Sequence, residues 1–313
     1  MDDKKRKEFE IDPNQFTPND KRKVIKGGCG ICIFVTKTGT TEEYVCKRTI
    51  RKLKMENGKK NLDLMLFDQE VDVLAQYHHP AIVPFIGYAI DQKHFGNIFL
   101  KFIENGSLDT YIKSVHKDPQ NNLLDNTNKL IISYGIARAM EFLHSHEILH
   151  RDLKSENVLL DKELRPYITD FGTSKAINAA HTSQTVQQTT ARIMPPEFIT
   201  DYEKYNRTPP IDMYSYAMVL YELWTEKPPY DEKCTISNVI DKTLKNDRPK
   251  FSSPAPGKNW QDLITQCWSE NPENRPPFTE IVKKLESDEF VNSDIDIQKF
   301  ESYKQMIDSQ AKK

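Results

Sequence analysis

Two short stretches decide the fold of this chain: HRDLKSEN at residues 150–157 and DFG at residues 170–172. Their acidic residues Asp152 and Asp170 are 18 positions apart, and a long helical pattern precedes both. A carboxylate can take up a proton or bind a divalent cation, and an amide oxygen such as that of Asn157 can complete a metal site. Either stretch alone could be a chance loop in which Asp and Asn cap turns. Both stretches in this order indicate one catalytic site.

The composition restricts the class of protein. The 313 residues include 44 basic and 46 acidic ones, which gives a formal net charge of −2, and five cysteines. Without a basic surplus we expect no nucleic acid partner, and without a long apolar run we expect no membrane partner. The charged first residues, MDDKKRKEFE, and the odd number of cysteines favour reduced thiols and a cytoplasmic location. We expect a monomer.

Local sequence patterns place β structure before helical structure. Runs rich in Val, Ile, Phe and Tyr predict strands in VIKGG, ICIFVT, EEYVCKR, HHPAIVPFIGYAI and GNIFLKFI. The spacing of apolar residues from Leu62 to Leu74 predicts one amphipathic helix between the third and fourth of these strands. Further helices are predicted at residues 127–148, which Asn126 or Thr127 could cap, and at 211–225, 260–267 and 279–285.

In this setting the two motifs resemble those of the eukaryotic protein kinases. The resemblance covers about residues 21–287 and implies an α+β, two-lobed protein-kinase fold. The N-lobe would be a small β-rich unit with one long helix at about residues 21–101, and the C-lobe a larger, mainly helical unit at about 104–287. We expect residues 1–20 to be a flexible lead-in and residues 288–313 to be a C-terminal helix or tail.

The resemblance also implies the chemistry. ATP and Mg²⁺, or Mn²⁺ in its place, would be the cofactors, and Ser or Thr hydroxyls of protein substrates would accept the phosphate. Asp152 would orient the hydroxyl or accept its proton, and Lys154 would stabilise the transferred phosphate. Asn157 and Asp170 would bind the metal.

A lysine and a glutamate complete the implied catalytic set. Lys47 in EYVCKR would contact the nucleotide phosphates, and Glu70 on the long helix would hold it. A surface ion pair of small energetic effect is the alternative for these two residues. Ile25 stands where the family has its first glycine. Besides Lys47 and Asp170, the expected ATP-binding residues are Ile25, Lys26, Gly27, Gly28, Gly30, Cys32, Val45, Leu100, Lys101, Phe102, Ile103 and Leu159.

Smaller cues concern the substrate and the subgroup. Lys154, two residues after Asp152, resembles the Ser/Thr kinases rather than the tyrosine kinases. Thr190 stands where such kinases place a threonine beside that pair and is the expected substrate-docking residue. Pro195 replaces the alanine of the usual Ala-Pro-Glu, which would stiffen the segment. Tyr214 and the Cys-Trp before NPENRP resemble the tyrosine-kinase-like group of Ser/Thr kinases.

Three residues are expected to be structural. Glu197 and Arg275 match a buried ion pair that supports the lower lobe of the family. Asp212 would brace the catalytic loop.

Regulation is also implied. Arg151 beside the catalytic aspartate is typical of kinases that are ordered by a phosphate on their activation segment. The candidates for this phosphate are Thr182, Ser183 and Thr185, and a merely flexible polar loop is the alternative. We interpret the CxxC pattern at residues 29–32 as neither a zinc site nor a redox site, because no second ligand pair follows.

Alternatives to a Ser/Thr kinase remain at this point. Ile25, Pro195 and Lys101, which replaces a glutamate common in the hinge, are compatible with a nucleotide-binding pseudokinase scaffold. A dual-specificity kinase and a small-molecule phosphotransferase are the others. In the last segment, Ile297, Phe300 and Tyr303 could share one face of a helix, which would dock on the lobe or bind a regulatory protein.

Overall fold

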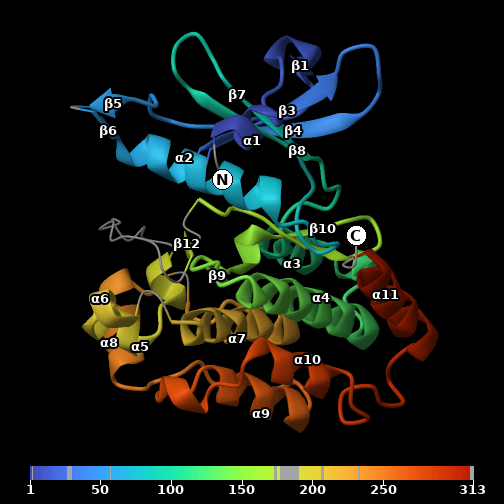
Figure 1. The fold of residues 1–313 in the computed structure, drawn as a ribbon. Coiled ribbons are helices and arrows are strands. Elements are labelled where there is room, and N and C mark those ends of the chain that lie inside the picture. Colours follow the sequence, from blue (N-terminus) through green and yellow to red (C-terminus); the bar gives the residue numbers. More distant parts are fainter. Residues whose placement is uncertain are drawn as a thin grey trace. The chain divides into compact units, whose positions relative to one another are not determined.

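The structure is a computed structural model, and it describes residues 1, 3–26, 30–56, 58–172, 175–176, 190–205, 208–231 and 233–310. The chain forms two compact units. The first comprises Met1–His78, Ile82–Glu104 and Asp170–Ser174, and the second comprises His79–Ala81, Asn105–Thr169 and Lys175–Lys313. The predicted α+β class is confirmed, with a β-sheet in the first unit and mainly helices in the second (Figure 1).

An antiparallel sheet forms the first unit, in the strand order β1-β3-β4-β8-β7, with β2 also paired to β3. Its β-branched and aromatic runs are those that predicted strands. The register places Cys32 opposite Lys47 and Val45 opposite Leu100. The strands are β1 (Phe16–Pro18), β2 (Ile25–Lys26), β3 (Ile31–Lys37), β4 (Glu43–Arg48), β7 (Phe85–Ile90) and β8 (Gly96–Lys101), and a separate hairpin consists of β5 (Met55–Glu56) and β6 (Lys59–Lys60).

Helix α2 (Leu62–Gln76) is the amphipathic helix predicted between the third and fourth runs. It begins at Asn61, whose side-chain oxygen accepts a hydrogen bond from the backbone N–H of Leu64. Phe67 on its buried face lies against β8 at Gly96, where a Cβ atom would be only 2.5 Å from the ring. Glycine at this position therefore lets the sheet approach the helix closely.

Residues 3–18 differ from the prediction, which left this segment without regular structure. They form α1 (Asp3–Lys7), a 3₁₀ turn (Pro13–Gln15) and β1, which pairs with β3. Phe16 stacks on Phe99 with ring centroids 4.5 Å apart, so the segment contributes to the core around Val35 and Cys46. A sequence of charged and polar residues is ordered here by contacts with residues far along the chain.

Helices dominate the second unit. The long helix predicted from residue 127 begins at Asp125, whose carboxylate accepts from the N–H of Asn128, rather than at Asn126 or Thr127. The helix predicted at residues 211–225 is α7 (Pro210–Thr225), which is apolar nearly all round and almost completely buried. The helices are α3 (Leu108–Lys117), α4 (Asn126–Ser145), α5 (Pro196–Thr200), α6 (Tyr202–Tyr205), α7 (Pro210–Thr225), α8 (Ile236–Leu244), α9 (Lys258–Cys267), α10 (Phe278–Leu285) and α11 (Ile297–Gln310).

Short strands and 3₁₀ turns connect these helices. The strands are β9 (Ile148–Leu149), β10 (Val158–Leu160), β11 (Pro166–Ile168) and β12 (Lys175–Ala176), and the turns span Pro119–Asn121, Ser155–Asn157, Thr190–Ile193 and Pro272–Asn274. β10 pairs with β11, and β12 pairs with β9. The loop from His150 to Asn157 thus lies between two small strand pairs that fix both of its ends.

The last helix, α11, packs on α4 of the same unit. Phe300 and Tyr303 are buried, and the rings of Tyr134 and Phe300 lie 5.3 Å apart. Ile297, expected on the same face, is 55% exposed because it begins the helix away from this contact. A Cβ atom at Gly135 would lie 2.2 Å from the hydroxyl of Tyr303, so glycine at this position of α4 allows α11 to pack closely. The apolar face of α11 is therefore buried against α4 of the same chain.

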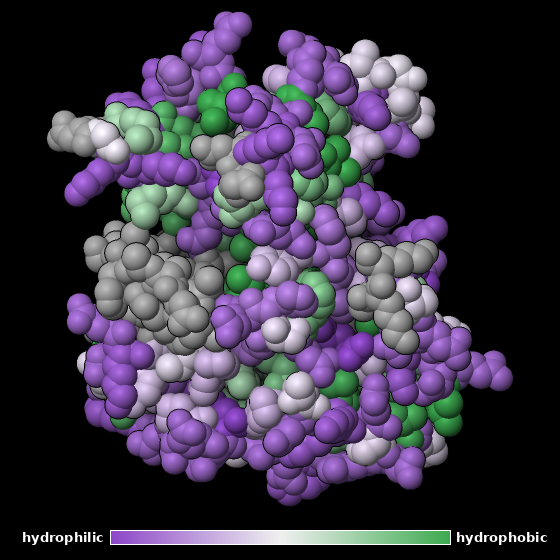
Figure 2. All heavy atoms as spheres, viewed as in Figure 1, coloured by the Kyte–Doolittle hydropathy of each residue, from purple (hydrophilic) through white to green (hydrophobic). Residues whose placement is uncertain are grey.

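The face of the molecule drawn in Figure 2 is mainly polar where its residues are described. On the face drawn in Figure 2, hydrophobic side chains form small separate groups among hydrophilic ones. In the part of the chain that the structure describes, no helix combines the length and the apolar character needed to cross a membrane.

Candidate active site

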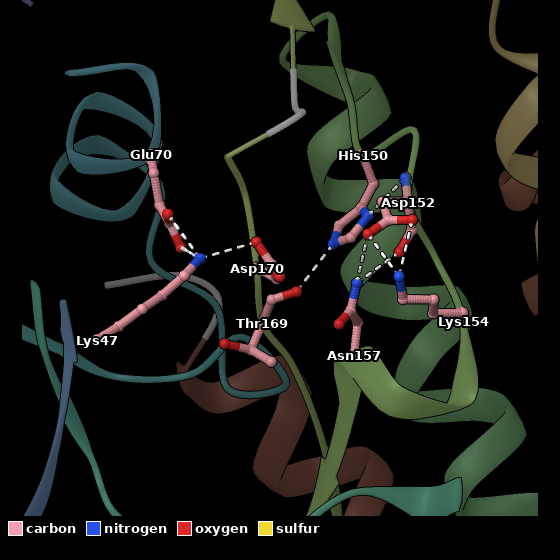
Figure 3. Close-up of polar contacts among 8 residues, drawn as sticks. All are labelled: Lys47, Glu70, His150, Asp152, Lys154, Asn157, Thr169 and Asp170. Atoms are coloured by element: carbon pink, nitrogen blue, oxygen red, sulfur yellow. Dashed lines mark hydrogen bonds and ion pairs between the residues drawn. The ribbon is translucent and has the colours of Figure 1, made fainter. Parts of the chain in front are cut away.

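In the first unit a lysine bridges two carboxylates. Lys47 is on β4, Glu70 on α2 and Asp170 at the start of the DFG segment. The Nζ atom of Lys47 is 2.6 and 2.7 Å from the two oxygens of Glu70 and 2.8 Å from Oδ1 of Asp170 (Figure 3). The contact between Lys47 and Glu70 expected from the sequence is present. All three side chains are largely buried, so this is not the solvent-exposed pair of the alternative interpretation.

The charges of this cluster suit a phosphate and a metal ion. Burial raises the pKa of Glu70, and the Lys47 ammonium opposes this shift. One cation and two carboxylates have a formal charge of −1, which attracts a divalent cation near Asp170. Within the described ranges no group of three or more His, Cys, Asp or Glu could hold a metal by itself. This donor set fits Mg²⁺, which proteins bind through one or two carboxylates together with substrate phosphates.

In the second unit the HRDLKSEN loop gathers a second polar cluster around Asp152. Lys154 Nζ lies 3.0 Å from Asp152 Oδ2, and Asn157 Nδ2 donates to the same oxygen at 3.0 Å and to the Asp152 carbonyl at 2.8 Å (Figure 3). The side-chain amide nitrogen of Asn157 is thus directed at Asp152, so its oxygen, the atom that binds metals, lies on the other side of the amide. His150 Nε2 is 3.1 Å from the carbonyl oxygen of Thr169 and ties the loop to the residue before Asp170.

Asp212 on α7 braces this loop, as expected from the sequence. Its carboxylate accepts the backbone N–H groups of His150 at 2.9 Å and Arg151 at 2.8 Å, and it lies 2.9 Å from His144 Nε2. Burial favours the protonated acid, but the hydrogen bonds from His144 and the backbone keep the pKa of Asp212 below its ordinary value. Arg151 has a positive φ of 68°, a strained conformation that these two hydrogen bonds hold in place.

The buried ion pair expected between Glu197 and Arg275 is also present. Arg275 donates to both oxygens of Glu197, at 2.5 and 2.9 Å, and to the carbonyls of Ser269 and Pro210. Pro195 precedes α5 with an extended backbone at φ −74°, close to the value that its ring imposes, so proline fits here without distortion.

A comparison with protein-family models matches residues 19–285 to the protein kinase domain. This chain belongs to the protein kinase family. It is 36% identical over 228 residues to the RGS domain-containing serine/threonine-protein kinase A of Dictyostelium discoideum, covering 72% of this chain and 19% of that protein. It is 33% identical over 267 residues to the serine/threonine-protein kinase TNNI3K of Mus musculus, covering 84% of this chain and 29% of the relative.

A plant kinase gives a similar match. The chain is 36% identical over 221 residues to the serine/threonine/tyrosine-protein kinase HT1 of Arabidopsis thaliana, covering 70% of this chain and 54% of HT1. The kinase described here thus spans between about a fifth and about half of the length of these curated relatives.

The expected nucleotide-binding residues of the kinase fall in both units. Ile25 and Lys26 are exposed on β2, and Gly30 lies so close to β4 that a Cβ atom would be 2.8 Å from the carbonyl oxygen of Arg48. Gly27, Gly28 and Cys29 lie outside the described residues. Burial raises the pKa of the Cys32 thiol, and the nearby Lys47 ammonium opposes this rise.

The expected hinge residues differ in exposure: Lys101 is exposed, Phe102 is half-buried and Ile103 is buried. Leu100 and Ile103 are buried, and the guanidinium carbon of Arg22 lies 4.2 Å from the centroid of the Phe102 ring. The backbone N–H of Lys101 donates to the carbonyl of Pro84, so Lys101 can offer a nucleotide only its carbonyl. In the second unit, Leu159 is half-buried on β10.

Other expected sites of the kinase are described only in part. Thr190 begins a 3₁₀ turn, and its side chain is outside the description. Thr182, Ser183 and Thr185, the candidates for phosphorylation, also lie outside the described residues.

One acidic residue was missed by the sequence analysis. Glu222 on α7 lines a pocket of about 210 Å³ together with Lys154, Ser155, Glu156 and Arg192. It accepts a hydrogen bond of 2.7 Å from the Ser155 hydroxyl. Burial, and to a smaller extent the nearby carboxylates, raise the pKa of Glu222 to about 7. A second carboxylate, besides that of Asp212, in the otherwise apolar sequence of α7 was the signal that could have found it.

Proposed function

We propose that this kinase transfers the γ-phosphate of ATP to serine and threonine hydroxyls of proteins. The observation that carries the proposal is that both polar clusters are intact. Lys47 is held by Glu70 beside Asp170 in the first unit, and Asp152 is held by Lys154 and Asn157 in the second.

Each residue of the second cluster has a proposed task. Asp152 accepts a hydrogen bond from the Ser or Thr hydroxyl of the substrate and takes its proton as the oxygen attacks. Lys154 stabilises negative charge on the transferred phosphate. Asn157 offers its amide oxygen to a metal, while its nitrogen keeps Asp152 in place.

In the first cluster Lys47 binds the nucleotide phosphates and Asp170 binds the metal. Glu70 acts by orienting Lys47, which would otherwise be free to adopt other rotamers. Bound Mg·ATP supplies the phosphoryl group and the positive charge that phosphoryl transfer requires. The residues proposed to surround the nucleotide are Ile25, Lys26, Gly27, Gly28, Gly30, Cys32, Val45, Leu100, Lys101, Phe102, Ile103 and Leu159.

A dual-specificity kinase is the second candidate. It is favoured by the names of two relatives, the serine/threonine/tyrosine-protein kinase HT1 and the dual specificity protein kinase pyk3 of Dictyostelium discoideum. Lys154 favours the Ser/Thr class. The intact clusters disfavour the pseudokinase scaffold, in which at least one of these residues is commonly lost.

Regulation, subgroup and location are parts of the same proposal. Phosphorylation of Thr182, Ser183 or Thr185 would activate the kinase, with Arg151, which precedes Asp152 in the sequence, as the cation that would bind the phosphate. Membership of the tyrosine-kinase-like group is supported by Tyr214 and by the sequence cues before Arg275. A cytoplasmic location is supported by the cysteines of the described residues, all of which are free thiols.

The experiment compares wild type with Lys47→Met and Asp170→Asn. Each protein is incubated with Mg-ATP and generic protein substrates, and phosphorylated residues are identified by mass spectrometry. Lys54→Met, which alters an exposed lysine, is the control and should retain activity. Phosphoserine and phosphothreonine that disappear in both variants support the proposal, and added phosphotyrosine supports dual specificity. An inactive wild type that still binds nucleotide supports the scaffold.

A further inference from the structure

An N-terminal segment that lies outside the matched kinase domain is attached to the first unit. Residues 3–18 precede residue 19, where the family match begins. The backbone N–H of Tyr88 on β7 donates to the carbonyl of Phe9 at 2.9 Å, and the N–H of Ile11 donates to the carbonyl of Tyr88 at 2.9 Å. The ring of Phe9 lies 5.7 Å from that of Phe85. The segment therefore packs against β7 in a defined position.

The absence of a side chain at Gly87 allows this close packing. A Cβ atom at Gly87 would be 2.6 Å from Cγ2 of Ile11 and 2.7 Å from the carbonyl oxygen of Phe9. Any larger residue at this position would push the segment away from β7. The sequence of β7 is thus compatible with the close approach of the N-terminal segment.

Arg6, in the same N-terminal segment, forms ion pairs with two aspartates of helix α2. Its Nη1 lies 2.8 Å from Asp68 Oδ1, while its Nε and Nη2 lie 3.0 and 2.7 Å from Asp72 Oδ1. The Arg6 side chain is 12% exposed, so these charge-assisted contacts are partly shielded from water. Lys60 of the β5–β6 hairpin contacts Asp68 as well. One guanidinium thus spans two carboxylates that are one helical turn apart.

The two carboxylates held by Arg6 lie on the opposite side of α2 from Glu70. In an α-helix, residues 68 and 72 share a face, and residue 70 is about 200° around the axis from each of them. Glu70 on this other face contacts Lys47 at 2.6 Å. Helix α2 is therefore fixed by a cation on each side, which restricts its rotation about its own axis.

We propose that Arg6 is a positioning residue that keeps Glu70 on Lys47 by fixing the rotation of α2. This inference rests on the proposed function of the Lys47–Glu70 pair in phosphoryl transfer. Without Arg6, the Met1 ammonium, 3.3 Å from Asp72 Oδ2, is the remaining described ion pair between the N-terminal segment and this face of α2. Glu70 is then held by Lys47 and the backbone N–H of Phe171, with less restraint from the opposite face of the helix. The position of Glu70 in the kinase domain then depends on residues that precede the matched family domain.

The test compares Arg6→Ala and Arg6→Lys with Lys7→Ala, which removes an exposed charge from the same short helix. We expect Arg6→Ala to lower kcat about 5- to 10-fold, the lower part of the range usual for coupling between two sites, with a small change in KM for ATP. Arg6→Lys keeps one contact and should restore part of the loss. Lys7→Ala should match wild type.

A double variant separates positioning from general destabilisation. In a Glu70→Gln background, measured at higher enzyme concentration, Arg6→Ala should cause little further loss of kcat because its effect passes through Glu70. An equal fold loss in both backgrounds, or an equal loss in Lys7→Ala, overturns the proposal.

Hydrogen exchange of residues 62–76 gives a readout that needs no activity. Arg6→Ala should speed exchange in α2 relative to wild type and Lys7→Ala. If wild type shows no kinase activity, the proposed function fails while faster exchange still supports the hold of Arg6 on α2. Unchanged exchange in α2 overturns the inference whatever the activity.

Discussion

Loss of Glu197 is expected to destabilise the second unit strongly. The side chain of Arg275 is 0% exposed, and Glu197 is its one charged partner among the contacts that the structure describes. Replacing Glu197 by Ala leaves a buried guanidinium with the carbonyl oxygens of Ser269 and Pro210 and the ring of Tyr214, none of which carries a negative charge. Breaking one side of a buried pair typically costs about 3–5 kcal/mol of the free energy of unfolding.

This free energy converts to a melting shift. The second unit has about 200 residues, so its entropy of unfolding is about 0.4 kcal/mol/K near 60 °C. A loss of 3–5 kcal/mol then lowers Tm by about 7–12 °C. Thermal unfolding followed by circular dichroism measures this shift. The matched control is Asp241→Ala, which breaks the exposed pair with Lys245 and should shift Tm by less than about 2 °C.

The double variant Glu197→Ala, Arg275→Met tests the reason for the loss. Removing the stranded cation as well should cost less than the sum of the two single variants, because the penalty comes from the unpaired charge. A single variant that melts within about 2 °C of the control, or strictly additive losses, would refute the reasoning.

Three other changes have definite expected results. Because the pKa of Glu222 in the folded state, about 7, is above its ordinary value of 4.5, wild-type stability should fall as pH rises between these values. Glu222→Gln should lack this fall and be the more stable protein at pH 8 in urea unfolding; identical pH profiles would contradict the shift. Gly135→Ala places a Cβ 2.2 Å from the Tyr303 hydroxyl and 2.5 Å from Pro166, and should cost about 1–3 kcal/mol. Adding Tyr303→Phe removes the clashing hydroxyl and should recover part of that loss. If stability does not recover, the clash with the Tyr303 hydroxyl is not the cause of the loss. The pKa of Asp212 is below 3.8, so its stabilising effect is present above that pH and is lost as pH falls through the folded-state value. Asp212→Asn should therefore be less stable than wild type at pH 7 and approach it in acid, whereas parallel curves would contradict this role.

The sequence was most informative where residue type alone sets local structure or chemistry. The Val, Ile and Phe runs predicted β3, β4, β7 and β8, and the resemblance to protein kinases implied that Lys47 would meet Glu70. The resemblance to protein kinases also placed Asp212 beside the loop from His150 to Asn157, whose backbone N–H groups it accepts.

The rest depends on contacts between distant residues. Arg6 and Asp72 are 66 positions apart, so nothing local indicates that a charged segment is ordered by α2. The raised pKa of Glu222 follows from burial, which a sequence does not display. Ile297 has the right spacing for the apolar face of α11 but begins the helix beyond the contact with α4. In each case the outcome depends on tertiary contacts between residues that are far apart in the sequence.

The pairing of β1 with β3 determines how this protein can be shortened. Val35 to Lys37 on β3 pair with residues 16–18, which lie before the start of the matched family domain. A fragment cut at residue 19 would expose the N–H and C=O groups of this edge and the core residues that Phe16 covers. Such an open edge can pair with another copy of the chain, so we expect the trimmed kinase to aggregate more readily than the longer chain.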